Sequence, residues 1–206
     1  MRGYRLTVIR HGATSASEQG IYIGVTDFEL SESGKAELYA KREEFEYPNV
    51  DMVYSSPLKR CTQTAEILFP DNEIKTVEAF KELNFGEFDG KSVDELVDLD
   101  EFKQWLKGGM NNAPPKGESV AQLIERTYAG IRDLFIEMTE KGYYHCALVS
   151  HGGVIANLMA CFGLPKNPPS EYSCESGEGF DIMLTTQLWH QAQAFEILGK
   201  APYLKD

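Results

Sequence analysis

The sequence lacks an apolar run long enough to cross a membrane. A membrane helix needs about 20 consecutive apolar residues, and polar or charged residues interrupt every apolar stretch of this 206-residue chain well before that length. The first apolar run, residues 4–9, begins so near the amino terminus that it leaves no room for a cleavable signal peptide. We therefore expect a cytoplasmic protein.

Basic residues are scarce. The chain has 20 Lys and Arg against 32 Asp and Glu, a formal net charge of -12. Such a charge repels nucleic-acid backbones and anionic membrane surfaces, so neither is an expected partner. A pocket for a phosphate would need several arginines to converge inside this acidic shell. The chain has seven: Arg2, Arg5, Arg10, Arg42, Arg60, Arg126 and Arg132.

Cysteines are few and carry no metal-binding pattern. The four of them, Cys61, Cys146, Cys161 and Cys174, form neither a C-x-x-C pair nor a zinc-type spacing. We expect free thiols, buried or half-buried, and no metal or cofactor. One alternative concerns Cys61, because the neighbouring Arg60 could lower the pKa of its thiol.

Apolar segments of two kinds alternate along the chain. Strand-like runs stand at residues 4–9, 51–54, 74–77 and 145–150, with a closing pair at 180–184 and 194–198. Helical patterns stand at 32–45, from Pro57 to Phe69, at 119–140 and at 153–163, with Ser31 and Ser56 as helix-capping residues. The acidic stretch 92–109 predicts one or two short helices.

This alternation predicts an α/β fold, a three-layer α/β/α sandwich with a mostly parallel central sheet and a small helical cap insertion. No internal repeat or linker divides the chain. We therefore expect a single domain over residues 1–206, with the insertion, called here the cap segment, at about residues 85–116.

Two of the predicted strands end in a histidine followed by glycine. Arg10-His11-Gly12 follows the first strand, and Ser150-His151-Gly152-Gly153 follows the strand at 145–150. Catalytic groups in open parallel sheets gather at the carboxyl ends of strands. The two histidines are therefore expected to share one site.

The residue types at these strand ends suit phosphate chemistry. A neutral His11 is a good nucleophile towards phosphorus, and Arg10 can both neutralise a phosphate and keep His11 neutral. Arg60, expected in the first turn of its helix, adds a guanidinium at a helix end that already favours anions. His151 can donate a hydrogen bond to phosphoryl oxygens, with the amide of Gly152 nearby.

A proton must also reach the leaving oxygen. Glu82 is the candidate donor, because apolar neighbours such as Leu83 and Phe85 could raise the pKa of its carboxyl. Metal binding by His11 and His151 is an alternative, but no H-x-x-x-H pair or carboxylate-rich helix accompanies them. His145 and His190 are interpreted as structural or solvated.

Taken together, these segments resemble the histidine phosphatase superfamily in its phosphoglycerate-mutase-like branch. The resemblance covers nearly the whole chain and rests on residues 8–14, 22–34, 53–65, 82–90, 115–119 and 149–153. It implies that His11 accepts the phosphoryl group, that Glu82 donates the proton, and that both histidines act with Arg10 and Arg60. The implied substrate-binding residues are Arg10, Ser17, Ile23, Gly24, Arg60 and Gly152. Ser17 departs from the family, which often has asparagine there.

The branch that the chain resembles contains hydrolases and bisphosphate-dependent mutases. A mutase needs extra cations in its cap, yet no arginine lies between Arg60 and Arg126. That part of the chain instead contains five clustered acids, Asp94, Glu95, Asp98, Asp100 and Glu101, which Lys103, Lys107 and Lys116 could partly offset. We expect a phosphomonoesterase acting on a small phosphorylated metabolite, without a cofactor. The alternatives are a phosphoglycerate mutase and a non-catalytic module that binds a phosphorylated ligand.

The substrate stays open at this point. The Phe-Gly-x-Phe-x-Gly segment at residues 85–90 resembles that of small-molecule phosphatases, including the alpha-ribazole phosphatases. Phosphoserine or a sugar phosphate fits the sequence equally well, and the oligomeric state leaves no signature in it.

Overall fold

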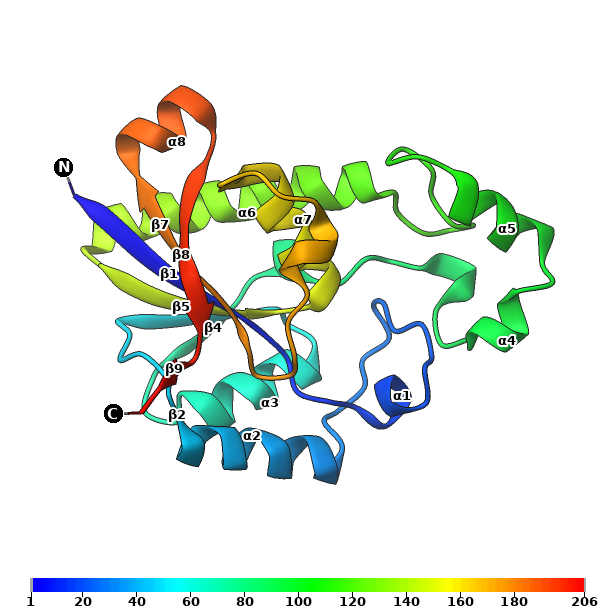
Figure 1. The fold of residues 1–206 in the computed structure, drawn as a ribbon, viewed down its shortest axis with the longest axis horizontal. Helices are drawn as coiled ribbons and strands as arrows, with labels where there is room; N and C mark the ends of the chain where they lie inside the picture. The colour runs from blue at the N-terminus through cyan, green and yellow to red at the C-terminus, as the bar shows by residue number, and fades with distance from the viewer. Residues whose placement is uncertain (1, 206) are drawn as a thin grey trace.

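A computed structural model describes residues 2–205, and within them a seven-stranded sheet forms the centre of the fold (Figure 1). The strand order is β4-β3-β5-β1-β7-β8-β6. The strands are β1 (Gly3–Arg10), β3 (Met52–Ser55), β4 (Ile74–Thr76), β5 (His145–Ser150), β6 (Gly163–Leu164), β7 (Gly179–Thr185) and β8 (Phe195–Ala201). Strands β2 (Phe45–Glu46) and β9 (Tyr203–Leu204) form a separate antiparallel pair.

The sheet is mostly parallel, as the alternation of strands and helices predicts. Strand β1 runs parallel to β5, and β3 runs parallel to both β4 and β5. Strand β7 is antiparallel to β1 and to β8, so the predicted closing pair of strands is confirmed. The register of β1 on β5 places Arg10 opposite Ser150, which brings the two His-Gly turns to the same edge of the sheet.

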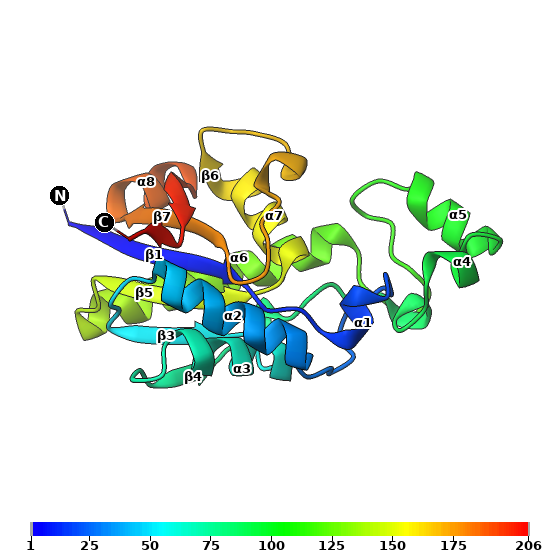
Figure 2. The same ribbon diagram turned by 60° about the horizontal axis from the view of Figure 1, so that its bottom comes forward.

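Helices cover both faces of this sheet (Figures 1 and 2). One face carries α2 (Glu32–Glu44) and α3 (Lys59–Leu68), and the other carries α6 (Val120–Lys141), α7 (Gly152–Phe162) and α8 (Thr186–Ala192). The remaining helices are α1 (Ser15–Glu18), α4 (Val93–Leu96), α5 (Asp100–Lys107) and the 3₁₀ turns Glu78–Phe80, Gly86–Phe88 and Pro169–Tyr172. No helix among residues 2–205 is long and apolar enough to cross a membrane.

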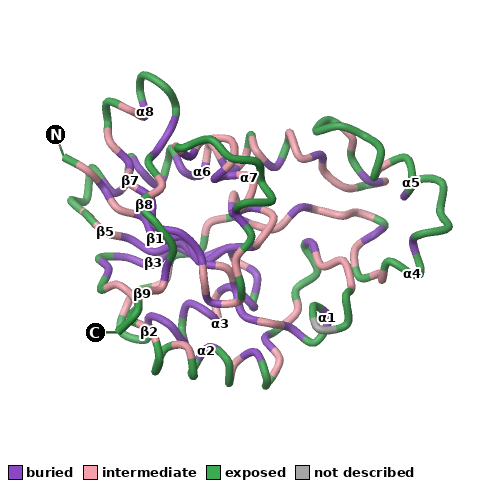
Figure 3. The backbone as a smooth tube through the Cα atoms, viewed as in Figure 1, coloured by how far each residue is buried: buried purple, intermediate pink, exposed green. Residues whose placement is uncertain are grey.

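Strand β1 shows why its residues form a central strand. Leu6 and Val8 pack in the core under α6 and α7, whereas Ile9 packs in the core under α2 and α3. A strand that is buried on both faces must be apolar on both, which explains its continuous apolar run. Figure 3 shows the same pattern, with the central strands buried and the cap segment largely exposed.

The start of α3 differs from the prediction. The helix begins at Lys59 after Leu58, without a side-chain cap, so the expectation that Ser56 caps a helix starting at Pro57 is wrong. The Ser56 hydroxyl bonds to Nε2 of His151 over 2.9 Å instead. Arg60 still lies in the first turn of the helix, as expected.

The cap segment extends away from the sheet and carries α4 and α5 (Figure 1). Its two ends cross at Gly86 and Gly117. Gly86 has a φ of +54°, and a Cβ there would lie 2.0 Å from the carbonyl oxygen of Pro115. The amide of Glu87 donates to that same carbonyl over 2.9 Å. This crossing fixes the base of the cap segment immediately after the residues around Glu82.

Candidate active site

His11 lies at the end of β1 and is largely buried, with 9% of its surface exposed. Its Nδ1 is 2.7 Å from the carbonyl oxygen of Gly12. A carbonyl only accepts, so Nδ1 carries the proton and Nε2 keeps a free electron pair. Burial, with the charges of Arg60 and Arg10, lowers the pKa of His11 to about 3. The imidazole is therefore neutral near pH 7, as a nucleophile must be.

His151 follows β5 and faces His11, with ring centroids 5.0 Å apart and an interplanar angle of 65°. Its Nδ1 accepts a hydrogen bond from Nε of Arg60 over 3.3 Å. Nε2 therefore carries the proton and donates to the Ser56 hydroxyl. Burial, together with His11 and the nearby arginines, lowers the pKa of His151 well below its usual value.

Arg60 is 1% exposed, which is unusual for an arginine. Its Nη1 donates to the carbonyl of Thr26 over 2.9 Å, and its Nη2 donates to that of Gly24 over 2.7 Å. The loop at residues 24–26 therefore holds the guanidinium beside His151. A Cβ on Gly24 would lie 2.4 Å from the carbonyl oxygen of Leu83, so glycine allows this loop to pack on the segment of Glu82.

Arg10 supplies a buried donor that has no protein partner. Its Nη1 donates to the carbonyl of Cys174 over 2.7 Å. Its Nε is buried without a hydrogen-bond partner anywhere in residues 2–205. Gly152 lies against this guanidinium, since a Cβ there would be 3.5 Å from Nε of Arg10. An unpaired buried donor costs about 1–3 kcal/mol, and an anion bound here would remove that cost.

Glu82 places a carboxyl at the amino end of α7. Its Oε1 accepts from the amide of Leu83 over 2.9 Å, and its Oε2 accepts from that of Gly153 over 3.2 Å. Burial raises the pKa of Glu82, and the two amides and the charges of Arg60 and Arg126 oppose that rise. Burial therefore favours the protonated carboxyl, which can donate a proton to a leaving oxygen.

The structure thus brings together most of the predicted site residues. His11, His151, Arg10, Arg60, Glu82, Gly24 and Gly152 are linked by the contacts described above. Ile23 precedes Gly24 in the loop that holds Arg60 and is half-buried. The assembly combines a neutral imidazole, two guanidinium groups and a buried carboxyl, and groups of these kinds can carry out phosphoryl transfer.

Ser17 is engaged elsewhere. Its hydroxyl donates to the carbonyl of Thr14 over 2.8 Å and accepts from the amide of Thr14 over 2.9 Å. The bond from the Thr14 amide, with the bond from the Ser17 amide to the Thr14 hydroxyl, forms the cap of the short helix α1. The part of Ser17 in substrate binding stays a prediction.

The cysteines are free, with Cys61 and Cys146 buried and Cys161 and Cys174 half-buried. The sulfur of Cys61 lies 3.4 Å from Nε2 of His151. The alternative of an activated Cys61 thiol is wrong, because burial raises the pKa of this thiol and outweighs the opposing charge of Arg60. No group of three or more His, Cys, Asp or Glu side chains in residues 2–205 is arranged to hold a metal ion.

Two residues support the site although their sequence pattern does not predict that they belong to it. Ser56 orients His151 through its hydroxyl, whereas the sequence predicts it as a helix cap. Asp89, in the cap segment, accepts from the amide of Gly24 over 2.7 Å and from the amide and hydroxyl of Thr26 over 2.9 and 2.8 Å. Asp89 therefore braces the loop that holds Arg60. Asp89 and Gly24 are 65 residues apart in the sequence, so no local sequence pattern indicates that they pair.

Comparison with known proteins gives this geometry a family. The pattern of the histidine phosphatase superfamily (branch 1) matches residues 6–178. Phosphoserine phosphatase 1 of Hydrogenobacter thermophilus is 30% identical over 157 residues, 71% of this chain and 70% of the relative. A 2,3-bisphosphoglycerate-dependent phosphoglycerate mutase of Bartonella tribocorum is 30% identical over 57% of this chain and 62% of its own length.

A solved structure has the same fold. The crystal structure of the alpha-ribazole phosphatase from Shigella flexneri superposes with a TM-score of 0.81. The match covers 98% of both chains at 20% sequence identity. The arrangement of the sheet and its helices is therefore shared along essentially the whole length.

Proposed function

This chain belongs to branch 1 of the histidine phosphatase superfamily, and we propose that it hydrolyses a small phosphomonoester through a phosphohistidine intermediate on His11. The observation that carries the proposal is the state of His11. Its imidazole is neutral, its Nδ1 proton is held by the Gly12 carbonyl, and its Nε2 is free to attack. Arg10 and Arg60 supply the positive charge for the phosphoryl oxygens.

In the first step, Nε2 of His11 attacks phosphorus and forms an N–P bond. The bond from phosphorus to the ester oxygen breaks, and its electron pair goes to that oxygen. Glu82 gives its proton to the same oxygen, so the product leaves as a neutral alcohol. The unpaired Nε of Arg10 is available to bind a phosphoryl oxygen in this step.

In the second step, water attacks the phosphohistidine. The Glu82 carboxylate takes a proton from the water, the N–P bond breaks, and its electron pair returns to Nε2 of His11. Inorganic phosphate leaves, and Glu82 is protonated again. The carboxyl thus acts as acid and then as base, and each cycle restores the starting enzyme.

Hydrolysis fits the charge of the cap segment better than a mutase reaction does. A mutase must keep a phosphorylated acid bound while that acid changes its orientation in the site. Free cationic side chains are needed to hold it. Lys116 pairs with Glu87 at 2.7 Å, and Lys103 donates to the carbonyl of Asp98 over 3.0 Å. Within this acidic segment, these two lysines are already engaged by the chain.

We further propose that the enzyme is cytoplasmic, needs no metal ion and works as one domain in which the cap segment borders the phosphate pocket. The free thiols fit a reducing compartment. Arg10 and Arg60 can stabilise the charge that a metal ion would otherwise neutralise. Dialysis against a chelator should leave the hydrolysis rate unchanged, and a loss that a divalent ion restores would contradict metal independence.

A screen of phosphorylated metabolites for released phosphate tests the function itself. Phosphoserine and alpha-ribazole phosphate belong among the substrates, because similar proteins are named as phosphatases of these compounds. Rapid quenching under alkaline conditions followed by mass spectrometry should find a phosphoryl group on the peptide that contains His11. The His11→Ala variant should lose both the adduct and the hydrolysis. Phosphate release by that variant at a near-normal rate, or binding without turnover by the wild-type protein, would reject the proposal.

A further inference from the structure

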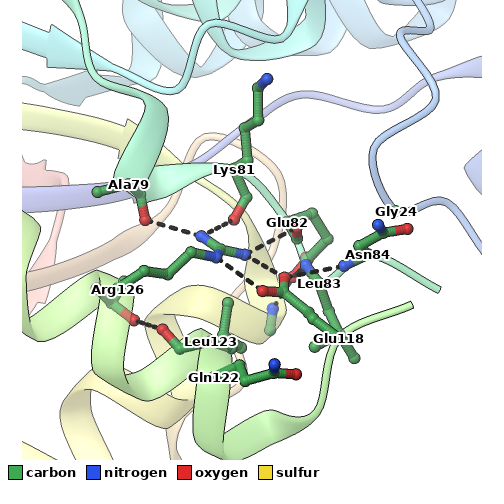
Figure 4. Close-up of polar contacts among 12 residues, drawn as sticks. Gly24, Ala79, Lys81, Glu82, Leu83, Asn84, Glu118, Gln122, Leu123 and Arg126 are labelled. Carbon is green, nitrogen blue, oxygen red and sulfur yellow. Dashed lines mark hydrogen bonds and ion pairs between the residues drawn. The ribbon is translucent and has the colours of Figure 1, made fainter. Parts of the chain in front are cut away.

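The segment that carries Glu82 has little regular structure of its own. Between β4 and the base of the cap segment at Gly86, its regular structure is the 3₁₀ turn Glu78–Phe80. One side chain of α6 holds it along its length (Figure 4). Nη1 of Arg126 donates to the carbonyls of Ala79 and Lys81, each over 2.8 Å, and Nη2 donates to the carbonyl of Glu82 over 3.0 Å.

Glu118 completes this arrangement from the end of the cap segment. Its carboxylate accepts from Nε and Nη2 of Arg126 over 3.0 and 2.5 Å. It also accepts from the amide of Asn84 over 3.0 Å, and the amide of Glu118 donates to the carbonyl of Asn84 over 2.9 Å. The guanidinium has five N–H groups, so these contacts, with the three carbonyls, occupy all of them.

On the premise of the proposed function, we propose that Arg126 and Glu118 are positioning residues that hold the Glu82 carboxyl at the leaving oxygen. They fix the backbone on both sides of Glu82, at residues 79–82 and at Asn84. Among the described residues, the hydrogen bonds to the carboxyl itself come from the amides of Leu83 and Gly153. Its position therefore depends on the backbone that Arg126 binds.

A small error in that position is costly. A displacement of about 1 Å can slow an enzymatic step by roughly 10²-fold. The planar fork of arginine reaches three carbonyls and a carboxylate at once, whereas the single ammonium of lysine has three donors on one nitrogen. Lysine at position 126 would keep the positive charge near Glu82 but could not make all of the hydrogen bonds to the backbone. The substitution therefore distinguishes an effect of the position of Glu82 from an effect of the nearby charge.

The test compares two substrates. One is the alkyl phosphate that the wild-type enzyme hydrolyses fastest in the screen, whose alkoxide must be protonated to leave. The other is p-nitrophenyl phosphate, whose phenolate leaves without a proton. The comparison uses kcat/KM, which reports the steps up to transfer of the phosphoryl group to His11 and leaves out the later hydrolysis that both substrates share. Arg126→Lys should lower kcat/KM for the alkyl phosphate by about 10- to 100-fold, within the roughly 10²–10⁴-fold that a general acid supplies, and lower kcat/KM for the aryl phosphate by less than about 3-fold.

Glu118→Gln is a second variant in case Arg126→Lys does not fold. It keeps an oxygen for the Asn84 amide and loses the ion pair, so it should show the same selectivity to a smaller degree. Arg132→Lys is the matched control on the same helix, because Arg132 pairs only with its exposed neighbour Asp133 among the ion pairs described for residues 2–205. It should leave both rates within twofold.

Combining the substitutions shows whether Arg126 acts through Glu82. Glu82→Gln should itself be selective for the alkyl phosphate, and adding Arg126→Lys to it should cause no further loss. Equal losses on both substrates, or full additivity in the double variant, would assign Arg126 a general structural role and overturn the inference. If Glu82→Gln shows no selectivity, the proposed role of Glu82 fails instead, and the two failures are distinguishable.

Discussion

At the scale of single residues, burial decides the chemistry of His11. An exposed histidine beside two arginines would still be partly charged in mild acid. Here burial is the largest cause that lowers the pKa to about 3, ahead of Arg60 and Arg10. In the unfolded chain this histidine takes up a proton near pH 6.5, whereas in the folded chain it stays neutral to about pH 3. His11 therefore lowers the free energy of unfolding as the pH falls from about 6.5 towards 3.

This state of His11 predicts its titration. Imidazole ¹⁵N resonances of the folded protein should show His11 as the neutral Nδ1-protonated form at pH 5, because a pKa of about 3 leaves it uncharged there. The His11→Gln variant assigns the signals. A protonation midpoint near 6.5 for His11 would mean that the site is hydrated and that the imidazole is not held as described.

The absence of a side chain at Gly153 leaves room for the Glu82 carboxyl. A Cβ at this position would lie 2.6 Å from Oε1 of Glu82. The carboxyl is the far end of a flexible side chain and can move, so Gly153→Ala should fold with a melting temperature within a few degrees of the wild type. Hydrolysis of alkyl phosphates should nevertheless fall by roughly 10-fold or more, because the proton donor is displaced.

The control for this substitution is Gly199→Ala in β8, where nothing lies within 4 Å of an added Cβ. It should leave kinetics unchanged. Unchanged hydrolysis of alkyl phosphates in Gly153→Ala would show that Glu82 tolerates displacement, and would weaken its assignment as the proton donor.

At the scale of elements, the loop at residues 24–26 connects the cap segment to α3. Asp89 binds the amides of Gly24 and Thr26, while the carbonyls of the same two residues accept from Arg60. Gly24 and Thr26 are thus each held at the amide by the Asp89 carboxylate and at the carbonyl by the Arg60 guanidinium. The position of the cap segment and the position of the Arg60 guanidinium are therefore coupled.

This coupling predicts the effect of Asp89→Ala. Loss of three hydrogen bonds to a charged acceptor should loosen the loop and Arg60 with it, and bonds of this kind contribute about 1.5–3 kcal/mol each. We expect the inhibition constant for inorganic phosphate to rise by about 10-fold or more. Asp94→Ala, an exposed acid of α4, is the control and should leave that constant unchanged. An unchanged constant in Asp89→Ala would show that Arg60 is held without the cap segment.

At the scale of the whole molecule, the charge is divided between an acidic surface and a pair of arginines, Arg10 and Arg60, beside the two histidines of the candidate site. The net charge of -12 does not prevent phosphate chemistry, because Arg10 and Arg60 lie within the fold beside His11 and His151. The exposed cap segment, residues 85–116, is itself acidic, with seven Asp and Glu against four Lys. Such a surface suits the release of an anionic product better than the retention of a phosphorylated acid.

This division of charge predicts hydrolysis without interconversion of phosphoglycerates. Incubated with 3-phosphoglycerate and followed by ³¹P NMR, the enzyme should release phosphate at a rate that 2,3-bisphosphoglycerate does not increase. Formation of 2-phosphoglycerate faster than phosphate, and dependent on the bisphosphate, would identify a mutase. Lys103, Lys107 and Lys116 would then be the first candidates for the missing cations.

The sequence by itself determined the features that rest on local pattern. The apolar runs predicted six of the seven strands of the central sheet and missed only the two-residue β6, and Ser31 caps α2 as predicted. The two His-Gly turns could be placed at one edge because parallel strands end together. The short helix α8 was missed, since seven residues at the end of a strand give too few turns for a periodic signal.

Only the tertiary structure decided which side chains hold the residues of the candidate site. Ser56 reads as a helix cap in the sequence, yet its hydroxyl is taken by His151, 95 residues away. Arg126 reads as a charged position on an amphipathic helix, yet it binds carbonyls 44 to 47 residues away. Backbone carbonyls and amides carry no residue identity, so their partners leave no trace in sequence spacing. Folding alone brings them within hydrogen-bond distance, and burial then strengthens each bond.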